Sequence, residues 1–288
     1  MRPMGTLDWA GVEVALPRLS DRLPGVSMAG FSHRARAPVD IAMVAHPSVT
    51  LFVDLSEGDG LTYDVGGRHE RGAVVVGLLP GDVRTTGRGA GECLQIRLEP
   101  VAAAAVLGSP SDICGLVVAL DDVWGCAAER AEARLRAAAS WDERFAIATK
   151  ILGRRLVARR PADPEVAQAW RRTRASRGRV RIDRLADEVG WSRKRLLSRF
   201  RSQLGITPKR AARLVRFDHA AHLLAAGHSA ATVAAASGYV DQSHLHRDVK
   251  EFSGQTPTAV AAAAWLAIDD VAWPIPRPAR PRPVAAGR

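Results

Sequence analysis

The chain has 288 residues, 47% of them hydrophobic, and a formal net charge of +11. This length and composition allow a sizeable buried core and favour two domains. No run of eighteen apolar residues is present and the first residues lack the apolar stretch of a secretory signal, so we expect neither a membrane span nor an exported protein.

The positive charge lies almost entirely in the C-terminal half. Residues 1–165 hold 19 Lys and Arg against 21 Asp and Glu, a balance of −2, whereas residues 166–288 hold 22 against 9, a balance of +13. A basic half beside a nearly neutral half is typical of proteins in which one domain contacts nucleic acid. Only four of the 41 basic residues are lysine, so genome composition also contributes, and charge alone does not establish DNA binding.

Three cysteines, Cys93, Cys114 and Cys126, show no C-x-x-C spacing. An odd number without that spacing argues against a disulfide framework or a zinc finger and favours a reducing compartment. We therefore expect three buried structural thiols and a cytoplasmic, nucleoid-associated protein.

Residues 40–98 have the pattern of β-strands. Short apolar runs alternate there with turn signals, which lie at residues 57–60, 66–67 and 80–81. The three clearest runs are Val49–Val53, Ala73–Leu79 and Leu94–Leu98. Strands separated by turns every 8–15 residues or so indicate a small sandwich or barrel.

The pattern becomes helical after Pro100. Two short helices are expected over Val101–Leu107 and Ala127–Ala139. A capping box, Ser140–Glu143, then starts a longer helix with apolar residues on one face, which ends before the linker Arg159–Pro164.

These patterns predict an α+β chain of two domains. Residues 1–160 are expected to form a β-rich sensor or dimerisation domain with flanking helices, and residues 161–265 an all-α domain. Residues 266–288 are expected to form a disordered tail, because Pro and Arg alternate from Pro274 onward.

An internal repeat occupies residues 181–258. The first copy contains Leu185–Ser192 and Thr207-Pro208, and the second contains Val233–Tyr239 and Thr256-Pro257. The copies are offset by 48 residues up to the glycine-aromatic pair and by 49 residues from the helix cap onward, because Val240 is inserted.

Each copy predicts two short helices joined by a tight turn. The first helix ends at Gly190 or Gly238, where glycine adopts a positive φ most easily. Ser192 or Asp241 then caps the second helix. Apolar residues on one face of that second helix and basic or polar residues elsewhere indicate a helix-turn-helix.

The candidate DNA-contacting residues lie on the polar faces of the two second helices. They are Arg193, Lys194, Arg195, Ser198 and Arg199 in the first copy, and Gln242, Ser243, His244 and Arg247 in the second. A single helix from Pro208 to Ala226, about 28 Å long, connects the copies, with Arg213, Arg216 and His219 on its polar side. That length suits two successive major grooves, about 34 Å apart, and Arg213 is expected to contact phosphate.

The stretch from Arg181 to Ala259 resembles the DNA-binding domain of the AraC/XylS family of bacterial regulators, most closely over Ala235–Arg247. Residues 40–160, including Leu120–Gly125, more weakly resemble the cupin-like N-terminal domain of some members. The family's base-reading positions correspond to Lys194, Leu197 and Ser198, and to Ser243, His244 and Arg247. Leu197 and Ser198 have little hydrogen-bonding reach, and Val249 stands where phenylalanine is usual.

The resemblance implies a sequence-specific DNA-binding transcriptional regulator rather than an enzyme. Double-stranded DNA is the expected partner, with RNA polymerase, a small-molecule effector and a second copy as further candidates. No cofactor or metal is expected. The alternative is a metal-dependent cupin enzyme with an accessory DNA-binding domain, but His33, His46 and His69 lack the close His-x-His spacing of a cupin site. A third possibility is a nonspecific nucleoid-type binder.

Overall fold

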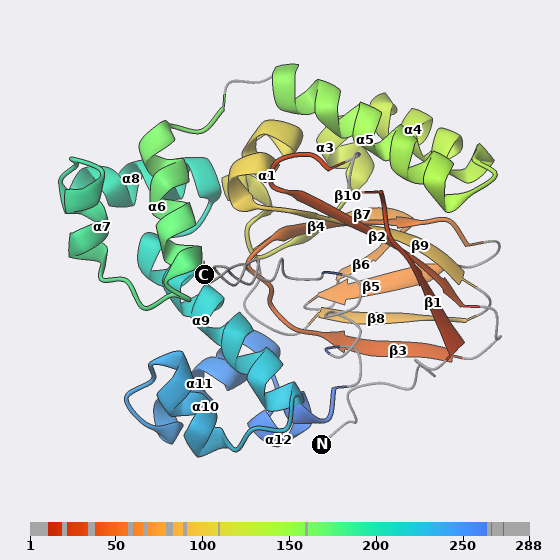
Figure 1. Cartoon of the computed structure of the whole chain (residues 1–288). Helices are drawn as coiled ribbons and strands as arrows, with labels where there is room; N and C mark the ends of the chain where they lie inside the picture. The colour runs from red at the N-terminus through yellow and green to blue at the C-terminus, as the bar shows by residue number, and fades with distance from the viewer. Residues whose placement is uncertain are drawn as a thin grey trace, which may run out of the picture.

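The computed structural model describes residues 11–18, 22–33, 38–56, 60–65, 68–78, 83–88, 91–108, 110–158, 161–263, 266 and 273. The N-terminal region holds two antiparallel sheets with helices on one side, and the C-terminal region is helical (Figure 1). This confirms the expected α+β architecture.

Six strands form the first sheet, in the order β1-β2-β9-β4-β7-β10. Their bounds are Val12–Ala15 (β1), Val26–His33 (β2), Gly91–Leu98 (β9), Val49–Asp54 (β4), Ala73–Val76 (β7) and Val117–Ala119 (β10). The second sheet has the order β3-β8-β5-β6, with bounds Pro38–Met43, Val83–Arg88, Leu61–Val65 and Arg68–Arg71. The three predicted apolar runs are β4, β7 and β9, whereas β1, β2 and β10 lie outside the stretch predicted to be strands. Residues 57–59, 66–67 and 80–81, which carry most of the predicted turn signals, lie outside the described residues.

The two faces of the first sheet have different surroundings because side chains alternate along each strand. On β9, Leu94, Ile96 and Leu98 belong to the core shared with the helices. The alternate residues, Cys93, Gln95 and Arg97, face the space between the two sheets. One strand therefore contributes both to the stability of the domain and to the lining of an internal cavity.

Five helices, two before β10 and three after it, belong to the N-terminal region, and helices cover the outer face of the first sheet (Figure 1). They are α1 (Pro100–Leu107), α2 (Pro110–Ile113), α3 (Leu120–Trp124), α4 (Cys126–Ala137) and α5 (Trp141–Ala158). One half of the predicted capping box is present, since Ser140 Oγ accepts a hydrogen bond from Glu143 N at 3.3 Å. The Glu143 carboxylate in turn accepts from Ala139 N at 2.9 Å.

Seven helices make up the described C-terminal region. They are α6 (Pro164–Ala175), α7 (Ile182–Glu188), α8 (Arg193–Leu204), α9 (Pro208–Ala225), α10 (Ala230–Ser237), α11 (Gln242–Ser253) and α12 (Pro257–Ala261). The expected linker corresponds to the stretch between Ala158, which ends α5, and Pro164, which begins α6; residues 159 and 160 within it lie outside the described residues. The segment from Pro274 onward also lies outside them.

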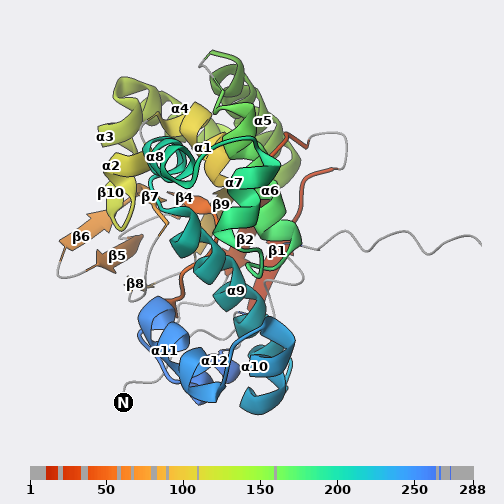
Figure 2. The ribbon, with the colours of Figure 1, turned by 90° about the vertical axis from the view of Figure 1, so that its left-hand side faces the viewer.

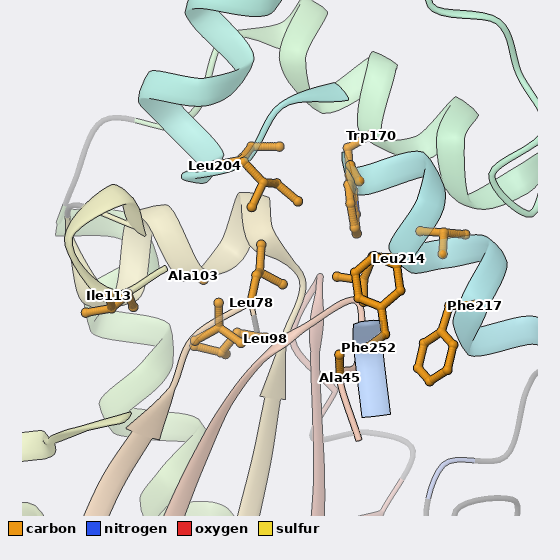
Figure 3. Close-up of a cluster of buried hydrophobic side chains, with 14 of the residues drawn as sticks. Ala45, Leu78, Leu98, Ala103, Ile113, Trp170, Leu204, Leu214, Phe217 and Phe252 are labelled. Carbon is orange, nitrogen blue, oxygen red and sulfur yellow. The ribbon is translucent and has the colours of Figure 1, made fainter. Parts of the chain in front are cut away.

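A single hydrophobic core joins the two regions. Figure 3 shows Leu98 and Ala103 of the N-terminal region close to Leu204 of α8, and Ala45 beside Phe252 of α11. Trp170 and Phe217 are fully buried in the same cluster. The helical region therefore packs directly on the sheet domain and its covering helices.

The three cysteines form no disulfide within the described structure, but not all of them are buried as expected. Cys93 and Cys114 are half-buried, whereas Cys126 is exposed, so the prediction of a buried thiol is wrong at that position. Cys126 begins α4 directly after Gly125, and the buried stripe of this helix uses Ala128, Ala131 and Leu135 instead. Among the described helices, none combines the length and apolar character needed to cross a membrane.

Gly30 of β2 offers a direct test of the packing between the sheet and α5. A Cβ atom at this position would lie 2.3 Å from Cε3 of Trp141, so Gly30→Ala has to displace the indole ring. We expect a loss of roughly 1–3 kcal/mol in the free energy of unfolding, measured by urea titration.

Gly153 in α5 is the matched control, because a Cβ atom there meets only Leu23 Cδ2 at 3.8 Å. Gly153→Ala should leave stability unchanged or raise it by up to about 1 kcal/mol, as alanine is the better helix former. Equal stability of the two variants would show that Trp141 does not pack on β2 as described.

Candidate nucleic-acid interface

The first helix-turn-helix unit consists of α7 and α8. Gly190 has a φ of +67°, which lets the chain reverse between the two helices. Trp191 N then donates to Ala186 O at 3.0 Å. Ser192 Oγ accepts a hydrogen bond from Arg195 N at 3.2 Å and caps α8.

The second unit, α10 and α11, repeats this local geometry. Gly238 has a φ of +74°, and Asp241 Oδ1 accepts from His244 N at 2.7 Å. The rings of Tyr239 and His244 meet edge to face with their centroids 5.3 Å apart. The inserted Val240 is 88% exposed in the turn, so the extra residue does not disturb the core.

Helix α9 connects the two units, which lie at its opposite ends (Figure 2). It has 18 residues and is therefore about 27 Å long. Thr207 Oγ1 caps it by accepting from Arg210 N at 3.2 Å, and Thr256 Oγ1 caps α12 in the same way by accepting from Ala259 N at 3.3 Å.

In the first unit, the candidate side chains of α8 are exposed, but several of them already contact other residues of the protein. Arg193 Nε forms an ion pair with Asp183 at 2.7 Å, and the Arg195 guanidinium lies 4.6 Å from the centre of the Trp191 ring. Arg199 is also paired, with Asp163. Lys194 and Ser198 are exposed, and Leu197 is 47% exposed.

In the second unit, Gln242, Ser243 and Arg247 of α11 are exposed, and His244 is half-buried against Tyr239. Arg247 Nε donates to Ser243 O of its own helix at 3.4 Å. Leu245 and Val249 are fully buried on the other side of the helix. The guanidinium of Arg247 therefore stands on the outer surface of the unit.

Arg213 of α9 has a different environment from the one that its sequence position suggested. Its guanidinium donates to Asp248 Oδ1 at 2.6 Å and also pairs with Glu251. Asp248 is only 1% exposed, so this is a largely buried ion pair between α9 and α11. The pair gives Arg213 a structural role, and its expected contact with phosphate stays a prediction.

Asp248 is a residue that sequence reasoning missed, although its position gives a signal. It falls between Leu245 and Val249 on the buried stripe of α11, where a carboxylate requires a partner. Burial raises the pKa of the Tyr239 hydroxyl above its ordinary value, and the neighbouring Asp248 carboxylate raises this pKa further. The Arg216 guanidinium lies 5.4 Å from the centre of the Tyr239 ring.

The loop of residues 44–48 connects the sheet domain to the second unit. Ala45 N donates to Phe252 O at 2.9 Å. This carbonyl lies in the last turn of α11, where carbonyl groups have no hydrogen-bond partner within the helix. His46 Nε2 lies 3.5 Å from Asp218 Oδ1 of α9. On the first unit, α8 packs against α1 and α2.

A cavity of about 210 Å³ lies between the two sheets and extends to α9. His33 and His46 line it, together with Asp218 and His222 of α9, whereas His69 does not. Among the described residues, no group of three His, Cys, Asp or Glu side chains has the spacing to hold a metal ion. The described residues therefore do not favour the alternative of a metal-dependent cupin enzyme.

Comparison with known proteins identifies the helical region. Residues 185–263 match a family model described as a helix-turn-helix domain. No curated protein sequence matches the chain.

Similar solved structures include regulators of low sequence identity. The C-terminal domain of AraT, a response regulator from Geobacillus stearothermophilus, is 21% identical, with 35% of this chain and 86% of that domain covered and a TM-score of 0.33. ToxT from Vibrio cholerae is 11% identical, with 85% of this chain and 98% of ToxT covered and a TM-score of 0.46. With both scores below 0.5, the identification depends on the domain match.

Arg213→Ala should destabilise the C-terminal region, because it leaves the Asp248 carboxylate buried without its cation. We expect a loss of roughly 3–5 kcal/mol in the free energy of unfolding, measured by urea titration. Arg199→Ala, which breaks the more exposed pair with Asp163, is the control and should cost about 1 kcal/mol or less. Unchanged stability of Arg213→Ala together with a lower salt dependence of DNA binding would favour the phosphate-contact role instead.

Proposed function

We propose that this chain is a DNA-binding transcription regulator with an AraC-type helix-turn-helix domain. It reads two successive major grooves of DNA, one with α8 and one with α11. The observation that carries the proposal is the pair of capped units at the two ends of α9, each with exposed polar side chains on its second helix. The length of α9, about 27 Å, is close to the rise of one DNA turn, about 34 Å.

The side chains proposed to contact DNA are those that stand on the outer faces of α8 and α11. Lys194, Arg195, Leu197 and Ser198 belong to the first unit, and Gln242, Ser243, His244 and Arg247 to the second. Arg193 is proposed to act with its partner Asp183 rather than as a free cation. Arginine is the best suited of these side chains to base recognition, because its fork matches O6 and N7 of guanine.

We further propose that the N-terminal domain, residues 1–160, regulates DNA binding by the domain of residues 161–265. Its cavity reaches α9, and its loop 44–48 and helices α1 and α2 contact both helix-turn-helix units. A ligand in the cavity therefore lies next to the element that sets the distance between the units. Dimerisation through this domain and contact with RNA polymerase are the remaining proposed interactions.

Arg247→Ala tests base recognition by the second unit. Binding to the preferred duplex, first selected from a pool of random sequences, should weaken by about 1–3 kcal/mol. Preference at one or two base pairs should relax, because one guanidinium no longer discriminates guanine. The measurement is a set of competition titrations with the selected and a scrambled duplex at two salt concentrations.

Arg154→Ala is the control for charge, since Arg154 is an exposed cation on α5, outside both helix-turn-helix units. This variant should bind both duplexes like the parent chain. If Arg247→Ala weakens both duplexes equally, Arg247 contacts the backbone, and specificity comes from Ser243, His244 or the first unit.

Leu197 gives a test of the first unit. An exposed apolar side chain on a recognition helix can contact the methyl group of thymine, worth about 0.8 kcal/mol. Replacing the contacted thymine by deoxyuridine should then weaken the parent chain about three- to fourfold and leave Leu197→Ala unaffected. An equal loss in both proteins at every thymine of the site would show that Leu197 reads no methyl group.

A further inference from the structure

Every second residue of β9 points into the cavity between the two sheets. Along β9 the sequence of inward positions is Gly91, Cys93, Gln95 and Arg97, and His33 of β2 pairs in register with Gly91. Arg97 lies toward the α9 end of this row and His33 at the other. Successive inward positions are about 6.7 Å apart, so the row spans roughly 20 Å.

Most of the lining is hydrocarbon. Phe31, Ile41, Met43, Phe52, Val76 and Val83 all contribute to it. Burial raises the pKa of the Cys93 thiol to about 12 and that of the Tyr63 hydroxyl well above its ordinary value. Both groups are therefore uncharged, and the middle of the cavity is neutral as well as largely apolar.

His33 is a residue of the cavity lining whose imidazole lacks a hydrogen-bond partner among the described residues. His33 is only 8% exposed, and within the described part of the chain neither of its ring nitrogens forms a hydrogen bond. A buried polar group without a partner is costly, so a ligand with a hydrogen-bonding group at this point gains the bond that the protein does not make.

Charged groups are confined to the α9 end, where they contact one another. His46 pairs with Asp218, and Arg97 NH1 lies 3.3 Å from His46 Nε2. The Arg97 guanidinium also stacks 4.3 Å from the centre of the Trp273 ring. A charged ligand would have to give up its own hydration and also displace one of these existing contacts.

The volume limits the size of the ligand. An apolar cavity of about 150 Å³ accommodates benzene. The cavity here, at about 210 Å³, suits a somewhat larger molecule.

We propose that this cavity binds a small, uncharged, mainly apolar molecule of one or two rings, and that His33 recognises its hydrogen-bonding group. The inference specifies the ligand class for the regulatory role proposed above and rests on that role only for its biological consequence. The ring system of the molecule contacts the hydrocarbon side chains of the lining, and its polar group faces the His33 imidazole.

The test measures binding of matched neutral and anionic probes to the full chain by calorimetry. The pairs are a naphthol with the matching naphthoate, para-ethylphenol with para-ethylbenzoate, and indole with an indole carboxylate. We expect at least one neutral probe to bind with a Kd below about 1 mM and its anionic partner to bind more than about tenfold more weakly. Tighter binding of the anions, or no binding of any neutral probe, overturns the proposal.

His33→Leu tests the recognising residue. It should weaken binding of the hydroxylated probes about five- to tenfold and leave para-ethyltoluene, which has no hydroxyl group, unaffected. His69→Leu is the control, because His69 is an exposed residue of β6 that pairs with Asp64 and does not line the cavity. If His33→Leu does not fold, as judged by circular dichroism, the same comparison is made with His33→Phe, which keeps a ring of similar shape without its nitrogen atoms. An equal loss of affinity for the hydroxylated and the hydroxyl-free probes would contradict a hydrogen bond between the ligand and the replaced side chain.

DNA titrations without and with the bound probe separate this inference from the proposed function. Probe binding without any change in DNA affinity leaves the ligand class standing and contradicts the regulatory role. A folded chain that binds no DNA at all would contradict the proposed function, whatever the cavity binds.

Discussion

The burial of α9 is the constraint on which the rest of the C-terminal structure depends. Nine of its 18 residues are buried, and α6, α8, α10, α11 and α12 all pack against it. Small side chains allow these close approaches: Ala212 O lies so near the turn after α6 that a Cβ atom on Gly178 would come within 2.0 Å of it. Because α9 is held on several sides, the separation of α8 and α11 is fixed by its length and not by a flexible joint.

The ion pair of Arg213 with Asp248 adds direction to this packing. Apolar contacts such as Phe217 with Phe252, whose ring centroids are 5.4 Å apart, tolerate sliding of α11 along α9. The buried pair of Asp248 and Arg213 does not tolerate such sliding, since any shift of α11 would leave the Asp248 carboxylate without its cation. The orientation of α11, and with it the direction of Arg247, is therefore set from the inside of the domain.

Local patterns in the sequence predicted the elements whose determinants are local. The positive φ of Gly190 and Gly238 and the caps Ser192 and Asp241 follow from residues within a few positions of one another. The sequence did not reveal β2, because Ala29 and Gly30 weaken its alternation and its pairing partner β9 is about 65 residues away. The ion pair of Arg213 was missed for the same reason: its partner Asp248 lies 35 residues further along the chain, in another helix. The residues that line the cavity could not be predicted, since only the pairing of remote strands brings them together.

The same rigidity limits how a ligand can act on DNA binding. Asp218, Ala221 and His222 line the cavity from the side of α9, but the packed interior of that helix leaves little room for local adjustment. A ligand must therefore shift α9 as a unit or move the loop 44–48, which holds Phe252 O through Ala45 N. A shift of α9 changes both helix-turn-helix units together, whereas a movement of the loop acts first on α11 through Phe252 O. Because coupling between two binding sites is reciprocal, DNA that favours one position of α9 changes the ligand affinity of the cavity by the same factor.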